Sequence, residues 1–173
     1  MKRNVEIKAR IADMAALTAR VKSVADQGPE IIRQEDTFFN SEQGRLKLRK
    51  FSDSQGELIY YERPDTGQPA ECQYRITPTS EPDKVIDMLS RSHGIRGVIR
   101  KTRTLYMDDQ TRIHLDEVEG LGTFLELEVV LRPNQDSSDG VQLAQKLMDR
   151  LGIKPADLVK TAYIDLLPER HIR

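Results

Sequence analysis

Charged residues recur at every second position in several short segments of the chain, and this alternation constrains the fold more than any other feature. In "GTFLELEVVL", residues 122–131, leucines fall on one face of an extended strand, and Glu126 and Glu128 fall on the other. The same alternation occurs in "NVEIKAR", "GRLKLRK" and "TRIHLDE". Because successive side chains of a strand point to opposite sides, each segment predicts a strand with one apolar and one charged face.

The charged faces allow two interpretations. In an antiparallel sheet with one wet face, they would be solvated and would pair across strands. In the alternative, they line the inside of a barrel, while the apolar faces point outward and pack under helices. We favour the second interpretation, because cations concentrate on some strands and carboxylates on others, and because the chain has enough helices to cover an apolar outer face. An eight-stranded barrel is just wide enough to hold one small ligand.

The order of the predicted elements supports this architecture. The predicted strands cover residues 5–11, 31–40, 45–51, 57–63, 71–78, 97–107, 111–118 and 122–131. Predicted helices cover residues 13–25, 80–92, 139–151 and 155–167, with Asp13 and Ser80 at two starts and Gly152 as a stop. The predicted fold class is therefore α+β: an eight-stranded antiparallel β-barrel, or tunnel, with a charged interior and helices packed outside. Residues 1–173 are expected to form a single domain.

The composition excludes several classes of protein. The chain has 173 residues, 38% of them hydrophobic, and a net charge of −1, which argues against binding to nucleic acid or to an anionic membrane. The single cysteine, Cys72, cannot form an internal disulfide and fits a reducing compartment. Neither a signal peptide nor a membrane span is evident. We therefore expect a soluble, cytoplasmic protein.

A charged barrel interior implies a charged ligand, because burying uncompensated charge is very costly. Inward-facing cations would require an anion with several negative charges. Inward-facing carboxylates would require divalent cations. A polyphosphate together with magnesium or manganese supplies both.

The motifs resemble those of the triphosphate tunnel metalloenzymes, also called the CYTH superfamily. "NVEIKAR" is similar to the N-terminal Glu-x-Glu-x-Lys strand of that family, "GRLKLRK" to its basic strand and "VIRKTRTLY" to its later Lys-x-Arg strand. "HLDEVEGLGTFLELE" resembles its long acidic signature and, with "LIYYERPD", is most like the class IV adenylyl cyclases. The resemblance covers almost the whole chain. One position departs from it: Asn4 stands where the family motif has its first glutamate, which puts a second metal subsite in doubt.

Strand parity and the resemblance together select candidate site residues. Magnesium prefers oxygen ligands, and Asp116 is preferred to Glu117 because it continues the face of Arg112 and His114. The candidate Mg²⁺ or Mn²⁺ ligands are Glu6, Asp116, Glu126 and Glu128. The candidate catalytic residues are these four and Lys8. The candidate triphosphate-binding residues are Lys8, Arg10, Arg45, Lys47, Arg49, Arg63, Lys101 and Arg103, with Arg75 as a weaker candidate.

Other chemically reactive residues receive no role at this stage. The histidines have no metal-ligand spacing, so no zinc site is predicted at His93, His114 or His171. Cys72 and Tyr163 are expected to be packing residues. Because no P-loop or GxGxxG motif occurs, phosphate binding by a glycine-rich loop is not expected.

The resemblance leaves three functions open. In an adenylyl cyclase, a phosphorus–oxygen lyase, the ribose 3′-hydroxyl of ATP attacks the α-phosphorus and releases pyrophosphate. In an inorganic tripolyphosphatase or a thiamine triphosphatase, water attacks the terminal phosphorus. The third is a non-catalytic module that binds polyphosphate or nucleotide, for which Asn4 would be consistent. The cyclase is the leading hypothesis, with a small triphosphate as the expected partner; a homodimer is compatible with the sequence.

Overall fold

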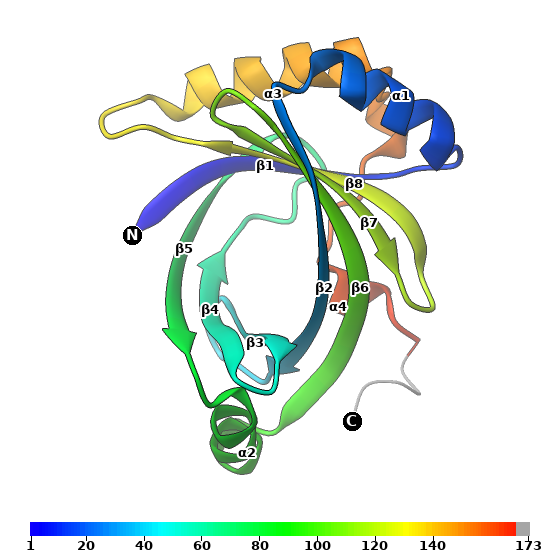
Figure 1. Ribbon diagram of the computed structural model, residues 1–173. Coiled ribbons are helices and arrows are strands. Elements are labelled where there is room, and N and C mark those ends of the chain that lie inside the picture. The colour runs from blue at the N-terminus through cyan, green and yellow to red at the C-terminus, as the bar shows by residue number, and fades with distance from the viewer. Residues whose placement is uncertain (169–173) are drawn as a thin grey trace.

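The computed structural model describes residues 1–168, so His171 lies outside the described residues. Eight antiparallel strands close into a barrel, as predicted, and their order around it is β1-β5-β4-β3-β2-β6-β7-β8 (Figure 1). The strands are β1 (Lys2–Arg10), β2 (Gln27–Phe39), β3 (Arg45–Ser52), β4 (Gln55–Glu62), β5 (Ala70–Thr79), β6 (Ile95–Asp108), β7 (Thr111–Val118) and β8 (Gly122–Val130). The helices are α1 (Met14–Val24), α2 (Pro82–His93), α3 (Ser137–Leu151) and α4 (Tyr163–Leu166).

The main hydrophobic core lies outside the barrel, as the tunnel interpretation predicts. Ile7 of β1, Ile113 of β7 and Leu127 of β8 are buried against Leu17 of α1 and Leu147 of α3. In Figure 1, α1 and α3 lie across the wall that these three strands form. The opposite face of the same strands points into the barrel. No described helix has the length and apolar character needed to cross a membrane.

The ends of the first three helices follow local sequence rules. Asp13 accepts a hydrogen bond from the backbone N–H of Ala16 through Oδ1 at 3.0 Å, which confirms the predicted N-cap of α1. Gly152 ends α3 with a left-handed φ of +71°, as predicted. The predicted cap of the second helix was wrong by one residue: Glu81 precedes α2, and Pro82 is its first residue, where a missing N–H has no cost.

The predicted fourth helix, residues 155–167, was wrong. The chain forms a 3₁₀ turn at Pro155–Asp157, continues in an extended conformation and becomes helical only in α4. The physical reason is that β1 extends beyond the end of β5, so the backbone near Lys8 lacks a partner on that side. Val159 donates its backbone N–H to the carbonyl of Lys8 at 2.8 Å and satisfies this edge.

This C-terminal segment closes one end of the barrel. Tyr163 and Ile164 of α4 are buried against Phe38, Ile99 and Phe124, whose side chains gather at that end. The rings of Phe124 and Tyr163 meet edge to face with centroids 5.0 Å apart. The barrel interior therefore has an apolar plug at this end.

Gly140 allows α3 to pack closely on the barrel. A Cβ atom at this position would lie 2.7 Å from Val5 Cγ2 and 2.8 Å from Leu131 Cδ2. We predict that Gly140→Ala lowers the free energy of unfolding by about 1–3 kcal/mol through overpacking, whereas the same change in an open helix position would add about 0.5–1 kcal/mol. Urea denaturation measures this difference. Ser138→Ala, in the exposed part of the same turn, is the control; an equally stable Gly140→Ala variant would contradict the prediction.

Candidate active site

The inner faces of all eight strands enclose a cavity of about 260 Å³. Its charged lining comes from residues that alternate with the outward-facing apolar core residues. The lining cations are Lys8, Lys47, Arg49, Arg63, Lys101, Arg103 and Arg112. The lining carboxylates are Glu6, Glu57, Glu126 and Glu128. The structure thus brings most of the sequence-predicted site residues together around one enclosed space.

Asp116 fixes the cations of β6. Lys101 donates to Asp116 Oδ2 at 3.0 Å, and Arg103 donates to both carboxylate oxygens at 2.7 Å. The hydroxyl of Tyr163 donates to Oδ2 at 2.9 Å. Burial alone would raise the pKa of Asp116, but Arg103 and Lys101 hold it well below its usual range. The structure therefore places Asp116 behind these cations, saturated with hydrogen bonds, and not in the cavity lining, where a metal ligand was expected.

Asp36 has the same role on β2, the strand next to β6, and sequence reasoning missed it. Lys47 donates to its Oδ2 at 2.8 Å, and Arg49 donates to both oxygens at 2.8 Å. Burial would raise the pKa of Asp36, yet Arg49 and Lys47 lower it well below the ordinary value. The alternation along β2 could have identified Asp36, because it lies on the same inward face as Gln34 and Phe38.

Two of the cavity lysines have pKa values well below the ordinary value for lysine. Burial, reinforced by neighbouring cations, lowers the pKa of Lys8 to about 8 and that of Lys47 to about 8. The ammonium group of Lys8 lies 4.1 Å from the centre of the Tyr163 ring and 3.6 Å from Glu126 Oε1. Tyr163, expected to be a packing residue, thus contacts charged groups of the site.

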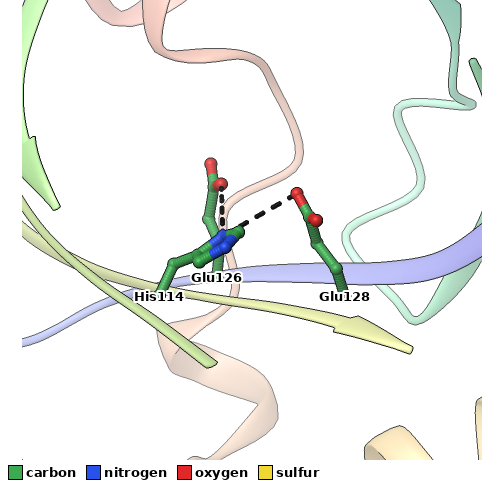
Figure 2. Close-up of side chains that lie close together, drawn as sticks. All are labelled: His114, Glu126 and Glu128. Atoms are coloured by element: carbon green, nitrogen blue, oxygen red, sulfur yellow. Dashed lines mark ion pairs between the residues drawn. The ribbon is translucent and has the colours of Figure 1, made fainter. Parts of the chain in front are cut away.

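A carboxylate–histidine cluster on β7 and β8 forms another part of the cavity wall (Figure 2). His114 Nδ1 lies 3.9 Å from Glu126 Oε2 and 3.8 Å from Glu128 Oε1. Burial would raise the pKa of Glu128, but His114 and Arg112 lower it to about 2. Burial and the charge of Arg103 lower the pKa of His114. Sequence reasoning gave His114 no role, although it shares its strand face with Arg112.

The same wall fits a divalent cation. Glu6 lies opposite Glu128 in the register of β1 and β8, and its pKa is raised by burial and by the charge of Glu128. His114 Nδ1 and Asn4 Oδ1 are buried without a hydrogen-bond partner. A cation at this wall would reduce the repulsion between Glu6 and Glu128, and it could be bound by the two atoms that lack a hydrogen-bond partner. Among the described residues, His114, Glu126 and Glu128 are the only group of three such side chains close enough to share an ion.

Three predicted phosphate-binding arginines lie elsewhere. Arg10 is exposed, donates to the carbonyl of Leu121 at 3.1 Å and covers the Phe124 ring at 4.7 Å, outside the cavity lining. Arg45 pairs with acidic side chains at 3.1–3.2 Å near the end that α4 closes. Arg75 is exposed and belongs to the outward face of β5. The alternation along the strands correctly placed Arg10 and Arg45 on the inward faces, but the apolar plug separates both side chains from the cavity.

A closed antiparallel barrel lined by anchored cations and a carboxylate wall defines a charged β-tunnel protein. The CYTH domain profile matches residues 2–163, and the chain therefore belongs to the CYTH family. Members of this family are adenylyl cyclases or triphosphatases, and they act on triphosphate substrates.

Individual relatives agree with this assignment. Adenylate cyclase CyaB of Aeromonas hydrophila is 28% identical over 172 residues, which covers 92% of this chain and 85% of that protein. The PH1012 protein of Pyrococcus horikoshii superposes with a TM-score of 0.84 at 24% identity, over 95% of this chain and 99% of the other. HpAC1 from Hippeastrum, described with a dominant triphosphatase activity, superposes with a TM-score of 0.65 at 15% identity, over 99% of this chain and 100% of the other. The two structural likenesses show the shared fold.

The lowered lysine pKa values predict a pH effect on anion binding. The protonated form of Lys47 attracts a polyanion, so its contribution is present below about pH 8 and is lost as the pH rises above this value. A Lys47→Arg variant stays protonated. We predict that the affinity of wild type for inorganic tripolyphosphate, relative to that of Lys47→Arg, falls by about tenfold between pH 7 and pH 9. Calorimetric titrations of both proteins give the ratio of the two affinities. The ionisation of tripolyphosphate affects both affinities equally and therefore cancels in this ratio. A ratio that does not change with pH would contradict the prediction.

Proposed function

We propose that this protein is a divalent-metal-dependent adenylyl cyclase that converts ATP to cyclic AMP and pyrophosphate inside the barrel. The observation that carries the proposal is that one cavity inside the barrel is lined by two groups of opposite charge. Cations anchored by Asp36 and Asp116 form one wall, and the carboxylates Glu6, Glu126 and Glu128 form the other. A triphosphate with a divalent cation has the charges that both walls require.

The anchored cations suit the triphosphate chain. Asp36 compensates one of the two charges on Lys47 and Arg49, and Asp116 compensates one of the two on Lys101 and Arg103. Lys47 and Arg49 therefore keep positive charge for phosphate oxygens, whereas Arg103 pairs with Glu126 as well, at 2.7 Å. Arginine can bind two such oxygens through its planar fork, and lysine provides a compact charge. Because these side chains are held before the ligand enters, little ordering is needed on binding.

Glu126 and Glu128, with Glu6 beside them, are the residues that would hold Mg²⁺ or Mn²⁺. Such an ion neutralises phosphate charge in nucleotidyl and phosphoryl transfer. In the proposed reaction, the ribose 3′-hydroxyl oxygen forms a bond to the α-phosphorus and loses its proton to solvent water. The bond from the α-phosphorus to the bridging oxygen breaks, and pyrophosphate leaves with that electron pair. The wall of Lys47, Arg49 and Lys101 would stabilise the negative charge on this leaving group.

Apolar residues in the lining support a nucleotide as the substrate. The side chains concerned are Ile32, Phe51, Ile59, Tyr74 and Ile76. Ile76 is 39% exposed although it belongs to the cavity lining. A nucleobase has apolar faces that such side chains can contact, whereas inorganic tripolyphosphate has none. The similarity to the Aeromonas adenylate cyclase supports the same choice.

Triphosphate hydrolysis is the second candidate function, and the activity described for HpAC1 favours it. The same cation wall would hold tripolyphosphate while water attacks the terminal phosphorus. Incubation with ATP or tripolyphosphate, in the presence of Mg²⁺ or Mn²⁺, separates the candidates. Cyclic AMP with pyrophosphate supports the cyclase, and orthophosphate supports the hydrolase. Binding without any product would identify a non-catalytic module, for which the replacement at Asn4 would be consistent.

We predict that Glu126→Gln lowers metal-dependent turnover by at least about a hundredfold, because a neutral amide binds a divalent cation more weakly than a carboxylate does. The fold should be retained, since Arg103 still pairs with Asp116. Product formation is measured together with the far-ultraviolet circular dichroism spectrum. Glu119→Gln, which neutralises an exposed carboxylate, is the matched control. Full activity of the Glu126→Gln variant would remove this residue from the site.

We also predict that Arg49→Ala weakens tripolyphosphate binding by at least about tenfold, the loss expected for one charge-assisted contact. Arg91→Ala is the matched control, because the Arg91 side chain lies on α2 and is 78% exposed. Titration calorimetry measures both affinities. Equal affinities of the two variants would count against the proposed cation wall.

A further inference from the structure

We infer that His114 is a metal ligand together with Glu126 and Glu128, and that this mixed donor set selects a transition-metal ion over Mg²⁺. The inference rests on the proposed function, because it specifies the ion of the same site. It adds an imidazole nitrogen to a wall that the sequence motifs describe by its carboxylates alone. The evidence comes from the register, the burial and the hydrogen bonds of this cluster.

The barrel register brings the three side chains together. His114 of β7 lies directly opposite Glu126 of β8, and Glu128 follows two residues later on the same face. The ligand atoms all lie within 4.8 Å of one another, and the side chains converge in Figure 2. Two of the three positions follow from the alternation within one strand, and the third follows from strand pairing.

The Nδ1 atom of His114 has no hydrogen-bond partner. The residue is 4% exposed, and its separations of 3.8 and 3.9 Å from the two carboxylates exceed hydrogen-bond distance. Buried polar atoms are nearly always satisfied, so an orphaned nitrogen aimed at two carboxylates requires a partner. Donor atoms that share one ion at bond lengths of roughly 2.0–2.2 Å lie about 3 Å apart. Small side-chain rotations would bring this group to such separations.

Neighbouring ion pairs orient the two carboxylates. Glu128 Oε2 accepts a hydrogen bond from Arg112 Nε at 2.8 Å, and Glu126 Oε2 accepts one from Arg103 at 2.7 Å. Residues that hold metal ligands in this way fix their orientation and contribute to metal affinity. The Oε1 atom of Glu128 faces His114, and Arg112 binds the other oxygen.

The donor set determines the ion. Magnesium prefers an all-oxygen environment, whereas imidazole nitrogen binds Co²⁺, Ni²⁺ and Zn²⁺ well. Carboxylates alone already bind transition-metal ions more tightly than Mg²⁺. The effect of His114 is therefore measured as the part of this preference that is lost when His114 is replaced. We expect the ratio of Co²⁺ affinity to Mg²⁺ affinity to fall by at least about tenfold in His114→Gln. Calorimetric titration of each metal alone, on wild type and on the variant, measures this ratio.

A second measurement does not depend on the folding of a variant at a buried position. Wild type loaded with Mn²⁺ should show coupling to an imidazole nitrogen in pulsed electron paramagnetic resonance. The chain has three histidines, so a His93→Gln/His171→Gln double variant keeps only His114. The same coupling in this double variant would assign the ligand to His114. Loss of the coupling there, or its absence in wild type, would overturn the inference.

These outcomes also separate the inference from the proposed function. Metal-dependent cyclic AMP formation without nitrogen coupling would leave the proposed function intact and overturn the ligand assignment. Nitrogen coupling that persists in the double variant, without any turnover of ATP, would support the ligand assignment and overturn the proposed cyclase. An unchanged ratio of Co²⁺ to Mg²⁺ affinity in a folded His114→Gln variant would show that His114 does not select the ion. An ion pair with a protonated imidazole would give that unchanged ratio.

Discussion

The structure depends on two buried aspartates that allow cations to converge inside a closed barrel. Asp36 on β2 holds Lys47 and Arg49 on the neighbouring β3, and Asp116 on β7 holds Lys101 and Arg103 on the neighbouring β6. Lysine and arginine side chains facing a common centre repel one another and lose hydration. One carboxylate between two cations offsets this cost without cancelling the positive charge. The interior is therefore stable enough to form and still attracts an anion.

On the wall formed by β1 and β8, carboxylates face one another inside the barrel. Glu6, Glu126 and Glu128 face the same cavity. Arg63 pairs with Glu6 at 3.3 Å, but burial and the charge of Glu128 still raise the pKa of Glu6. The orphaned nitrogen of His114 lies beside them. Lys47 and Arg49 thus keep positive charge, and the acidic wall holds three carboxylates beside an orphaned nitrogen, which is the complementarity that a metal–triphosphate complex would satisfy. The C-terminal segment adds the apolar plug and places the Tyr163 ring against Lys8.

Much of this arrangement follows from local patterns, and the errors have a common origin. Alternation along each strand predicted the inward direction of Glu6, Lys47, Arg103 and Glu128 because side-chain direction in a strand depends only on parity. Parity does not give depth along the barrel, and for this reason Arg10 and Arg45 were expected in a cavity from which the plug excludes them. It also does not identify partners across strands, so the anchoring role of Asp36 and the position of His114 were missed. The helix predicted at residues 155–167 failed because an unpaired edge of β1 binds that segment as extended chain.

The sequence by itself determined the strands, their two faces, the barrel with helices outside it and the charged side chains on the inner faces of β1, β3, β6, β7 and β8. These properties depend on neighbours within a few residues of one another, whose relative directions are fixed by backbone geometry. Only the tertiary structure decided which charges are neutralised and which stay available. That outcome depends on distances between side chains that are far apart in the chain, as between Lys101 and Asp116 or between His114 and Glu126. Electrostatic energy varies with those distances and with burial, and neither is specified until the barrel closes.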